Sequence, residues 1–150
     1  MVNDTTKLIY TLMFAFVLYL SYKTLRTRTK LGKEQIKFKA KPNRMMFVLT
    51  VLLILMIYMG QGAYIKGIVF AIALYFLYVN FEPIILTDEV IYYGARADKW
   101  EDIKQWAYDD KKSQLVIRLK INGRDQQRLL PVMPSDKEEI LEEIRKRKQK

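Results

Sequence analysis

A run of 37 residues, 45–81, carries one charged side chain, Lys66, and is interrupted near its middle by Gly60, Gln61 and Gly62. As one helix it would extend about 55 Å, which exceeds the roughly 30 Å hydrocarbon core of a bilayer. Glycine tolerates the backbone conformations of a tight reversal, whereas a glutamine amide is costly to bury in lipid. The run therefore predicts a transmembrane hairpin with helices over 45–59 and 63–81.

Residues 8–22 form another apolar segment, without any charged side chain. A cleaved signal peptide is the competing interpretation, but only Lys7 precedes the segment and no small-residue cleavage site follows Leu20. Basic residues begin at Lys23, as in a stop-transfer flank. Fifteen residues span only about 22 Å, so Lys7 and Lys23 must extend toward the two interfaces. We expect a third spanning helix here.

The basic residues of the chain are concentrated in the connector 23–44, which holds nine of them and one acidic residue. From residue 82 onward, fifteen basic residues face fourteen acidic ones. Short loops rich in lysine and arginine stay in the cytoplasm. The pattern predicts a multi-pass protein of the cell membrane, with its N-terminus outside and everything after residue 82 in the cytoplasm. Membrane topology thus accounts for the net charge of +10, and we expect no nucleic-acid partner.

Within the connector, Lys37, Lys39 and Lys41 alternate with apolar residues at period two. The simplest interpretation is a solvated, positively charged loop. Two alternatives are an extended segment lying on anionic lipid headgroups, with Lys37, Lys39 and Lys41 as the headgroup contacts, and an extra edge strand on the cytoplasmic domain.

In the last apolar segment, Gly67 and Ala71 are four residues apart. Small residues at this spacing let helices approach closely, so Gly67 and Ala71 are candidate helix-packing residues, within the chain or in a homo-oligomer. The same spacing also arises often by chance.

Pro83 marks a boundary between a transmembrane region, 1–82, and a cytoplasmic domain, 83–150, because the residue before a proline is disfavoured in helices. Alternating and β-branched patterns predict strands over 84–87, 90–93, 99–108, 115–121 and 125–132. Trp100 and Ile103 also fit one helical turn, but the neighbouring hairpins favour a strand. Asn122-Gly123 predicts a type I′ hairpin turn. A C-terminal helix is predicted over 135–148, with Ser135 and Glu138 as a capping box.

The stretches 86–93 (LTDEVIYY) and 99–103 (KWEDI), the strand 115–121 and the glutamate-rich last helix resemble bacterial PH-like (pleckstrin-homology-like) membrane proteins. These are small, mostly uncharacterised proteins, frequent in Gram-positive bacteria. The resemblance implies two or three spanning helices and a cytoplasmic PH-like domain. A full domain of this kind has seven strands, so five imply either a reduced version or a strand from the connector. Some relatives are linked to self-protection against membrane-active bacteriocins.

The fold expected is therefore three transmembrane helices followed by a small antiparallel β domain with a C-terminal helix. The chain has no histidine and no cysteine, which removes imidazole acid-base chemistry and thiol nucleophiles. The adjacent acids Asp109 and Asp110 fall in a predicted turn, where aspartate bonds its own backbone. We expect no enzyme, no cofactor and no metal site.

The first hypothesis for function is a non-catalytic membrane adaptor or regulator. Its cytoplasmic domain would bind a membrane or cytoplasmic protein partner or inner-leaflet lipid, in membrane stress protection or bacteriocin immunity among other roles. The alternative is an accessory subunit of a transporter or cell-envelope complex that acts through its helices.

Overall fold

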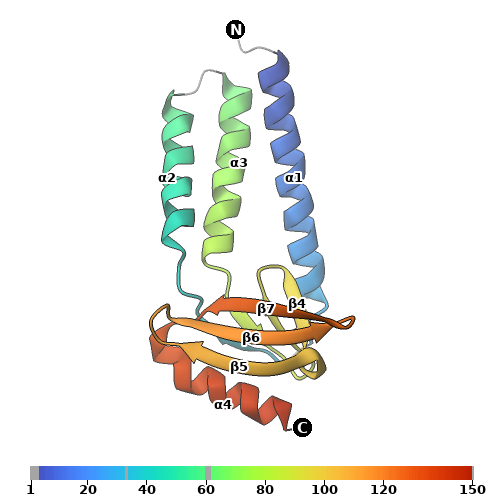
Figure 1. Cartoon of the computed structure of the whole chain (residues 1–150). Coiled ribbons are helices and arrows are strands. Elements are labelled where there is room, and N and C mark those ends of the chain that lie inside the picture. The colour runs from blue at the N-terminus through green and yellow to red at the C-terminus, as the bar shows by residue number, and fades with distance from the viewer. Residues whose placement is uncertain (1–3, 33, 60–61, 150) are drawn as a thin grey trace. The chain divides into compact units, whose positions relative to one another are not determined.

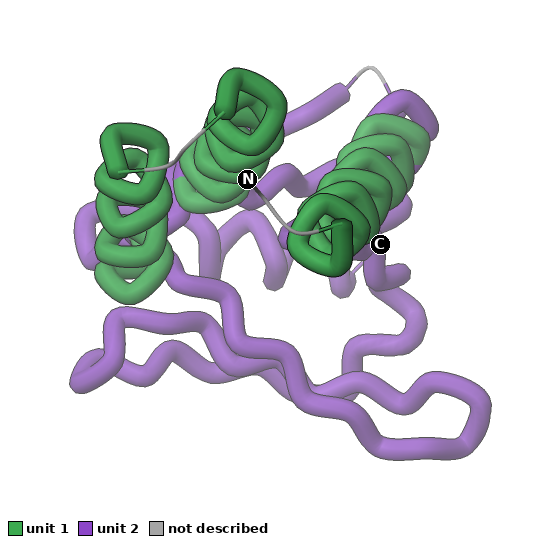
Figure 2. Tube along the Cα trace, turned by 90° about the horizontal axis from the view of Figure 1, so that it is seen from above, with its two compact units in different colours: residues 1–26, 42–80 green, residues 27–41, 81–150 purple. Residues whose placement is uncertain are grey.

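The structure, a computed structural model, describes residues 4–32, 34–59 and 62–149. The chain divides into two compact units, one of Met1–Arg26 with Pro42–Asn80 and the other of Thr27–Lys41 with Phe81–Lys150 (Figure 2). The backbone therefore passes between the units three times. The sequence predicts a connector over all of 23–44, whereas residues 27–41 belong to the unit that holds the sheets. Figure 1 labels the helices and strands of both units.

The first unit consists of three helices, α1 (Asp4–Thr29), α2 (Arg44–Met59) and α3 (Ala63–Asn80), of which α1 runs three residues into the second unit. Helices α1 and α3 are long and apolar enough to cross a membrane, and α2, with 16 residues, is a shorter apolar helix. Helix α1 extends beyond the predicted 8–22 at both ends. Asp4 suits a first turn and accepts from Lys7 Nζ at 3.2 Å, and lysine and arginine are good helix formers at the other end. The predicted reversal at Gly60 and Gln61 lies outside the described residues.

Inside this unit, Val17 of α1 packs with Ile68 and Ile72 of α3. Thr11 Oγ1 and Tyr64 Oη, 3.0 Å apart, add a hydrogen bond between the same two helices. Most of the remaining apolar side chains of the three helices are exposed. Such surfaces are unusual on a soluble monomer and suit lipid or another apolar partner.

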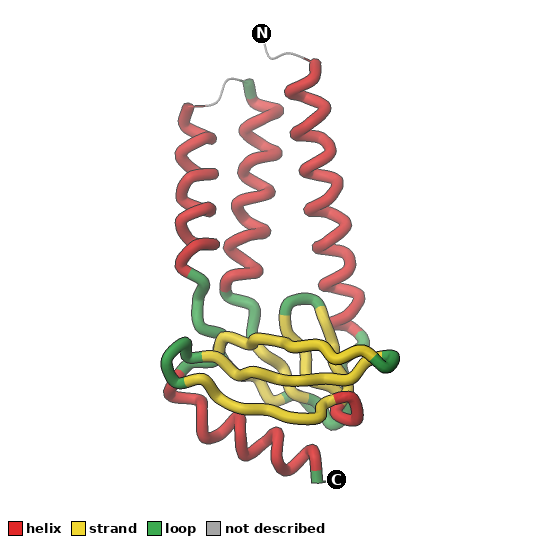
Figure 3. Tube along the Cα trace, in the orientation of Figure 1, coloured by secondary structure: helices red, strands yellow, loops and turns green. Residues whose placement is uncertain are grey.

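The second unit holds two antiparallel sheets (Figure 3). The four-stranded sheet has the order β1 (Ile36–Phe38), β2 (Ile84–Leu86), β3 (Val90–Tyr93), β4 (Arg96–Lys99). The three-stranded sheet has the order β5 (Ile103–Asp109), β6 (Gln114–Ile121), β7 (Arg124–Pro131). Between the sheets, a 3-10 turn, η1 (Trp100–Asp102), replaces the first part of the strand predicted over 99–108. The three-residue spacing of Trp100 and Ile103 thus belongs to a helical turn, and the strand prediction was wrong there.

Strand β1 comes from the basic connector and pairs with β2, with Phe38 opposite Ile84. Of the interpretations of the connector, the structure thus contains the extra edge strand. Phe38 is 3% exposed and belongs to one core shared by both sheets and the last helix. The other buried members of this core are Ile84, Leu86, Ile91, Trp100, Ile103, Leu115, Ile117, Leu119, Leu130, Val132, Ile140 and Ile144.

Strand β6 shows why this sandwich forms, since every second residue, Leu115, Ile117 and Leu119, is buried and the residues between them are more exposed. Asn122 and Gly123 have φ of 50° and 77°, so both positions of the β6–β7 turn have the positive φ that the hairpin prediction required.

The last helix begins slightly later than predicted, as a 3-10 turn η2 (Pro134–Asp136) followed by α4 (Lys137–Lys148). The predicted capping box does not form, because Ser135 Oγ donates to Asp136 Oδ1 at 2.7 Å and the helix start has no side-chain cap. The turn at Pro134 moves the helix start past Ser135. Burial of Ile140 and Ile144 in the core attaches α4 to the sandwich.

Candidate functional site

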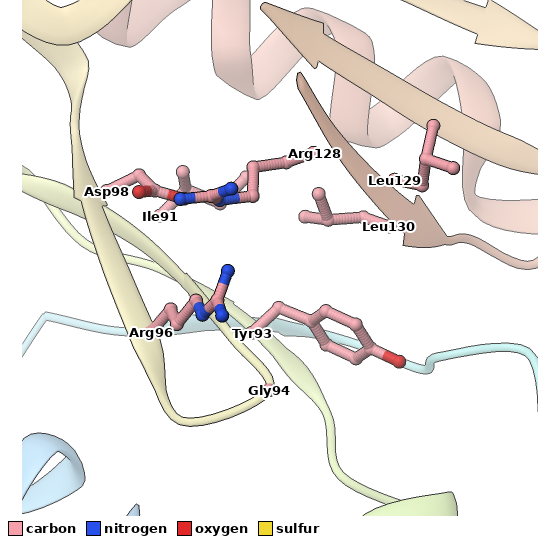
Figure 4. A pocket seen from close by; sticks show the side chains of 8 residues that line it. All are labelled: Ile91, Tyr93, Gly94, Arg96, Asp98, Arg128, Leu129 and Leu130. Atoms are coloured by element: carbon pink, nitrogen blue, oxygen red, sulfur yellow. The ribbon is translucent and has the colours of Figure 1, made fainter. Parts of the chain in front are cut away.

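A cleft of about 270 Å³ lies between the two sheets, at the edge strands β4 and β7 (Figure 4). Gly94 and Ala95 join β3 to β4 and both have φ of 60°, as in the tightest hairpin turns. This turn brings Arg96, the first residue of β4, to the cleft. The complete lining is Ile91, Tyr93, Gly94, Arg96, Asp98, Arg128, Leu129 and Leu130.

An ion pair between Asp98 of β4 and Arg128 of β7 crosses the cleft, with Oδ2 and Nε 3.5 Å apart. The side chains are 15% and 23% exposed, respectively. Arg128 Nη2 also donates to Gln126 Oε1 at 2.7 Å. Its Nε is buried and, within the described part of the chain, has the ion pair but no hydrogen bond of good geometry. Part of the hydrogen-bonding capacity of this guanidinium is therefore unused.

The charges of the cleft do not cancel. Burial raises the pKa of Asp98, and Arg128, followed by Arg96, opposes that rise. Arg96 is exposed and has no ion pair among the described residues. Figure 4 shows its guanidinium pointing toward that of Arg128. Two guanidiniums and one carboxylate leave the cleft with an excess positive charge.

The ring of Tyr93 lines the cleft, and Figure 4 shows its hydroxyl pointing away from the two guanidiniums. Burial, with a smaller effect of the Glu82 carboxylate, raises the pKa of Tyr93 above its ordinary value of 10.0. The phenol therefore stays protonated at neutral pH and can donate a hydrogen bond. The donors of the cleft are the N–H groups of two guanidiniums, and its lining has no histidine, which suits binding of an anion better than acid-base chemistry.

A separate buried pair stabilises β3. Tyr92, fully buried, donates its hydroxyl hydrogen to Glu82, which is 2% exposed. A buried carboxylate without a hydrogen-bond donor would be costly. The hydroxyl of Tyr92 supplies that donor to Glu82, which lies two residues before β2.

The predicted headgroup residues Lys37, Lys39 and Lys41 are all exposed and alternate along extended backbone. Lys37 lies on β1, and the backbone N–H of Lys41 donates to Pro131 O at 2.8 Å. Of the predicted helix-packing residues, Gly67 is exposed with open space where a Cβ would stand. Ala71 lines an apolar groove of about 340 Å³ between α1 and α3.

The acidic residues of the loops take structural roles. Asp109 Oδ1 accepts the backbone N–H groups of Lys111 and Lys112 at 3.0 and 3.3 Å, as expected for a turn. The described residues contain no group of three acidic side chains that could hold a metal ion.

Sequence reasoning missed Tyr93, Arg96, Asp98 and Arg128. Asp98 and Arg128 are 30 positions apart, and no motif links them. The one local signal was Gly94 directly after a β-branched and aromatic strand, which indicates a turn and thus a strand beginning near Arg96.

Comparison with known families adds one finding. Residues 81–149 match a family described as a domain of unknown function (DUF5673). The match covers the residues from β2 to the end of α4 and therefore the whole cleft, but not β1. No curated protein and no solved structure matches the chain.

Proposed function

We propose that this protein is a non-catalytic adaptor or regulator, anchored in the cell membrane, whose β domain binds a partner at the cleft between β4 and β7. The observation that carries the proposal is the cleft itself, where Arg96 and Arg128 outnumber Asp98. Guanidinium groups facing a small concave site are suited to recognising a carboxylate or a phosphate. Membrane stress protection or bacteriocin immunity is one setting in which such a module would act.

The membrane anchor is supported by α1 and α3, whose length and composition suit a bilayer. Helix α2 spans about 24 Å, so a third crossing requires the bilayer to thin or flanking residues to reach the interface. With Lys- and Arg-rich residues 23–44 held in the cytoplasm, the N-terminus is outside and the β domain inside.

The PH-like architecture is also part of the proposal. Four strands in one sheet, three in the other and a C-terminal helix give the strand number that the resemblance implies. The seventh strand is β1, which lies within the basic connector. The β domain is therefore joined to the helical unit at both ends of the segment that carries β1, and again between residues 80 and 81.

The test uses site-specific photo-crosslinking in the full chain in native membranes. A photoreactive amino acid replaces Leu129 at the rim of the cleft or, in a matched variant, Tyr58, an exposed residue of α2. We expect a defined protein adduct from position 129. Adducts from position 58 alone would contradict the proposal and favour the accessory-subunit alternative.

That alternative has one specific observation in its favour. The groove between α1 and α3 is lined by Val17, Leu18, Leu74 and other apolar residues, and Gly67 leaves open space on α3. Another apolar helix, from a complex or a second copy, would fit such surfaces.

The lipid-contact hypothesis for Lys37, Lys39 and Lys41 has its own test. The full chain is placed in nanodiscs of anionic or neutral lipid and treated with a water-soluble amine-acetylating reagent. Anionic lipid should protect the three lysines, whereas Lys120, exposed on β6, serves as the control. Equal labelling in both lipids would remove the hypothesis.

A further inference from the structure

We infer that the cleft binds an extended acidic segment of a protein partner, which adds as a strand to the free edge of β7 and places a carboxylate against Arg96 and Arg128. The inference rests on the proposed function and names the chemistry of its partner. Three features of the structure support it: an open backbone edge, one guanidinium in excess over the carboxylate of the cleft, and an apolar rim.

The open edge follows from the strand pairing. Among the described residues, β7 pairs along its length only with β6. At one end of its other edge, Pro131 O accepts the backbone N–H of Lys41 at 2.8 Å. In an antiparallel strand the N–H and C=O of one residue point to the same side, and every second residue shares that side. The backbone groups of Leu129 and Gln127 therefore point to the free edge.

This free edge adjoins the cleft, since Arg128 lies between Leu129 and Gln127 and reaches across to Asp98 on β4. Edge strands with unpaired N–H and C=O groups accept an extended peptide, whose main chain supplies the hydrogen bonds. The continuation of β1 through Lys41 occupies the Pro131 end, so an added strand would lie along residues 125–129.

The charges select an acidic peptide. Among the residues described, Arg96 has no ion pair, and the Nε of Arg128 has only the 3.5 Å ion pair with Asp98. A carboxylate can accept from both guanidiniums. A single carboxylate neutralises the one excess positive charge of the cleft, whereas a phosphate dianion would leave the cleft with a net negative charge.

The rim selects an apolar residue beside the acid. Leu129 is 51% exposed, and Ile91 and Leu130 form an apolar lining within the cleft. Successive side chains of an added strand point to opposite faces, so alternating glutamate and valine would satisfy the guanidiniums on one face and cover Leu129 on the other.

The probe is a fluorescein-labelled, end-blocked peptide of alternating valine and glutamate, titrated into the full chain in detergent micelles and followed by fluorescence anisotropy. A peptide with glutamine in place of glutamate is the matched control. We expect the glutamate peptide to bind at least about tenfold more tightly, because a charge-assisted contact to arginine is replaced by a neutral one.

The test variant is Arg96→Gln, chosen because Arg96 is exposed and its loss should not affect folding. Lys120→Gln makes the same charge change on the outer face of β6 and controls for net charge. We expect Arg96→Gln to weaken the glutamate peptide about tenfold and Lys120→Gln to leave it unchanged. Two glutamate peptides, one N-methylated on its valines and the other on its glutamates, should differ in affinity. Only one of them has methyl groups on the edge that pairs with β7.

Equal weakening by both variants, equal binding of the glutamate and glutamine peptides, or equal binding of the two methylated isomers would overturn the inference. So would Arg96-dependent binding of anionic vesicles without binding of the peptide, which would assign the cleft to a lipid headgroup. Failure of the proposed function is a separate result, because in that case no protein adduct forms from the photoreactive residue at position 129. If that adduct forms while the peptide fails to bind, only the acidic-strand inference is wrong.

Discussion

Phe38→Ala should destabilise the β domain strongly, although Phe38 lies far from the other strands in the sequence. Its ring is 3% exposed and sits in the core with residues of both sheets. Truncating a buried phenylalanine costs about 3–5 kcal/mol, from lost apolar contact and the cavity left behind. Domains of this size are stable by about 5–15 kcal/mol in total, so the change removes a large part of the stability.

The same cost can be expressed as a melting temperature. For a domain of fewer than 100 residues, each kcal/mol lowers Tm by roughly 4–8 °C, so Phe38→Ala should lower it by at least about 12 °C. The control is Lys37→Ala on the same strand, an exposed side chain whose loss should change stability by less than about 0.5 kcal/mol.

Tryptophan emission is a suitable assay for the full chain in detergent micelles. Both tryptophans, Trp100 and Trp106, belong to the β domain, and Trp100 is 6% exposed with Nε1 donating to Thr87 O at 2.9 Å. Thermal unfolding followed by emission therefore reports on this domain and not on the helices. A shift for Phe38→Ala no larger than that of Lys37→Ala would refute the placement of β1 in the sandwich.

Three further predictions concern the cleft, a turn and a buried pair. Arg128→Gln should raise the pKa of Asp98 further, because the nearest positive charge is lost; the carboxyl ¹³C shift of Asp98 checks this. Since a raised pKa favours the folded state only at low pH, the stability lost in Arg128→Gln should be larger at pH 7 than at pH 4 in denaturant titrations. Gly123→Ala, at φ of 77°, should cost about 1 kcal/mol, and Gly32→Ala, with no atom within 4 Å, should cost little in the same melting assay. Tyr92→Phe should cost about 1–3 kcal/mol, measured by chemical denaturation, because the buried carboxylate described above loses the donor that Tyr92 provides.

The sequence predicted much of the architecture because the signals involved are local. Long apolar runs predicted α2 and α3 to within a residue, and Asn122-Gly123 identified the β6–β7 turn. Helix propensity, turn conformation and alternation of side chains depend on neighbours a few positions away. The capping box failed for a related reason, since Ser135 had a closer local partner in Asp136.

The pairing of distant segments could not be read in the same way. The period-two pattern in the connector is compatible with a loop, a lipid-bound segment or a strand, and only the pairing with β2 shows that residues 36–38 form a strand. Likewise Asp98 and Arg128 meet because two sheets stack, and nothing near either residue in the sequence indicates the other. The sequence by itself determined that apolar helices precede an antiparallel β domain, because those properties follow from short-range periodicity and composition. Only the tertiary structure decided that a strand from between the helices completes that domain and that a cationic cleft opens at its edge, because both depend on which distant backbone edges come together.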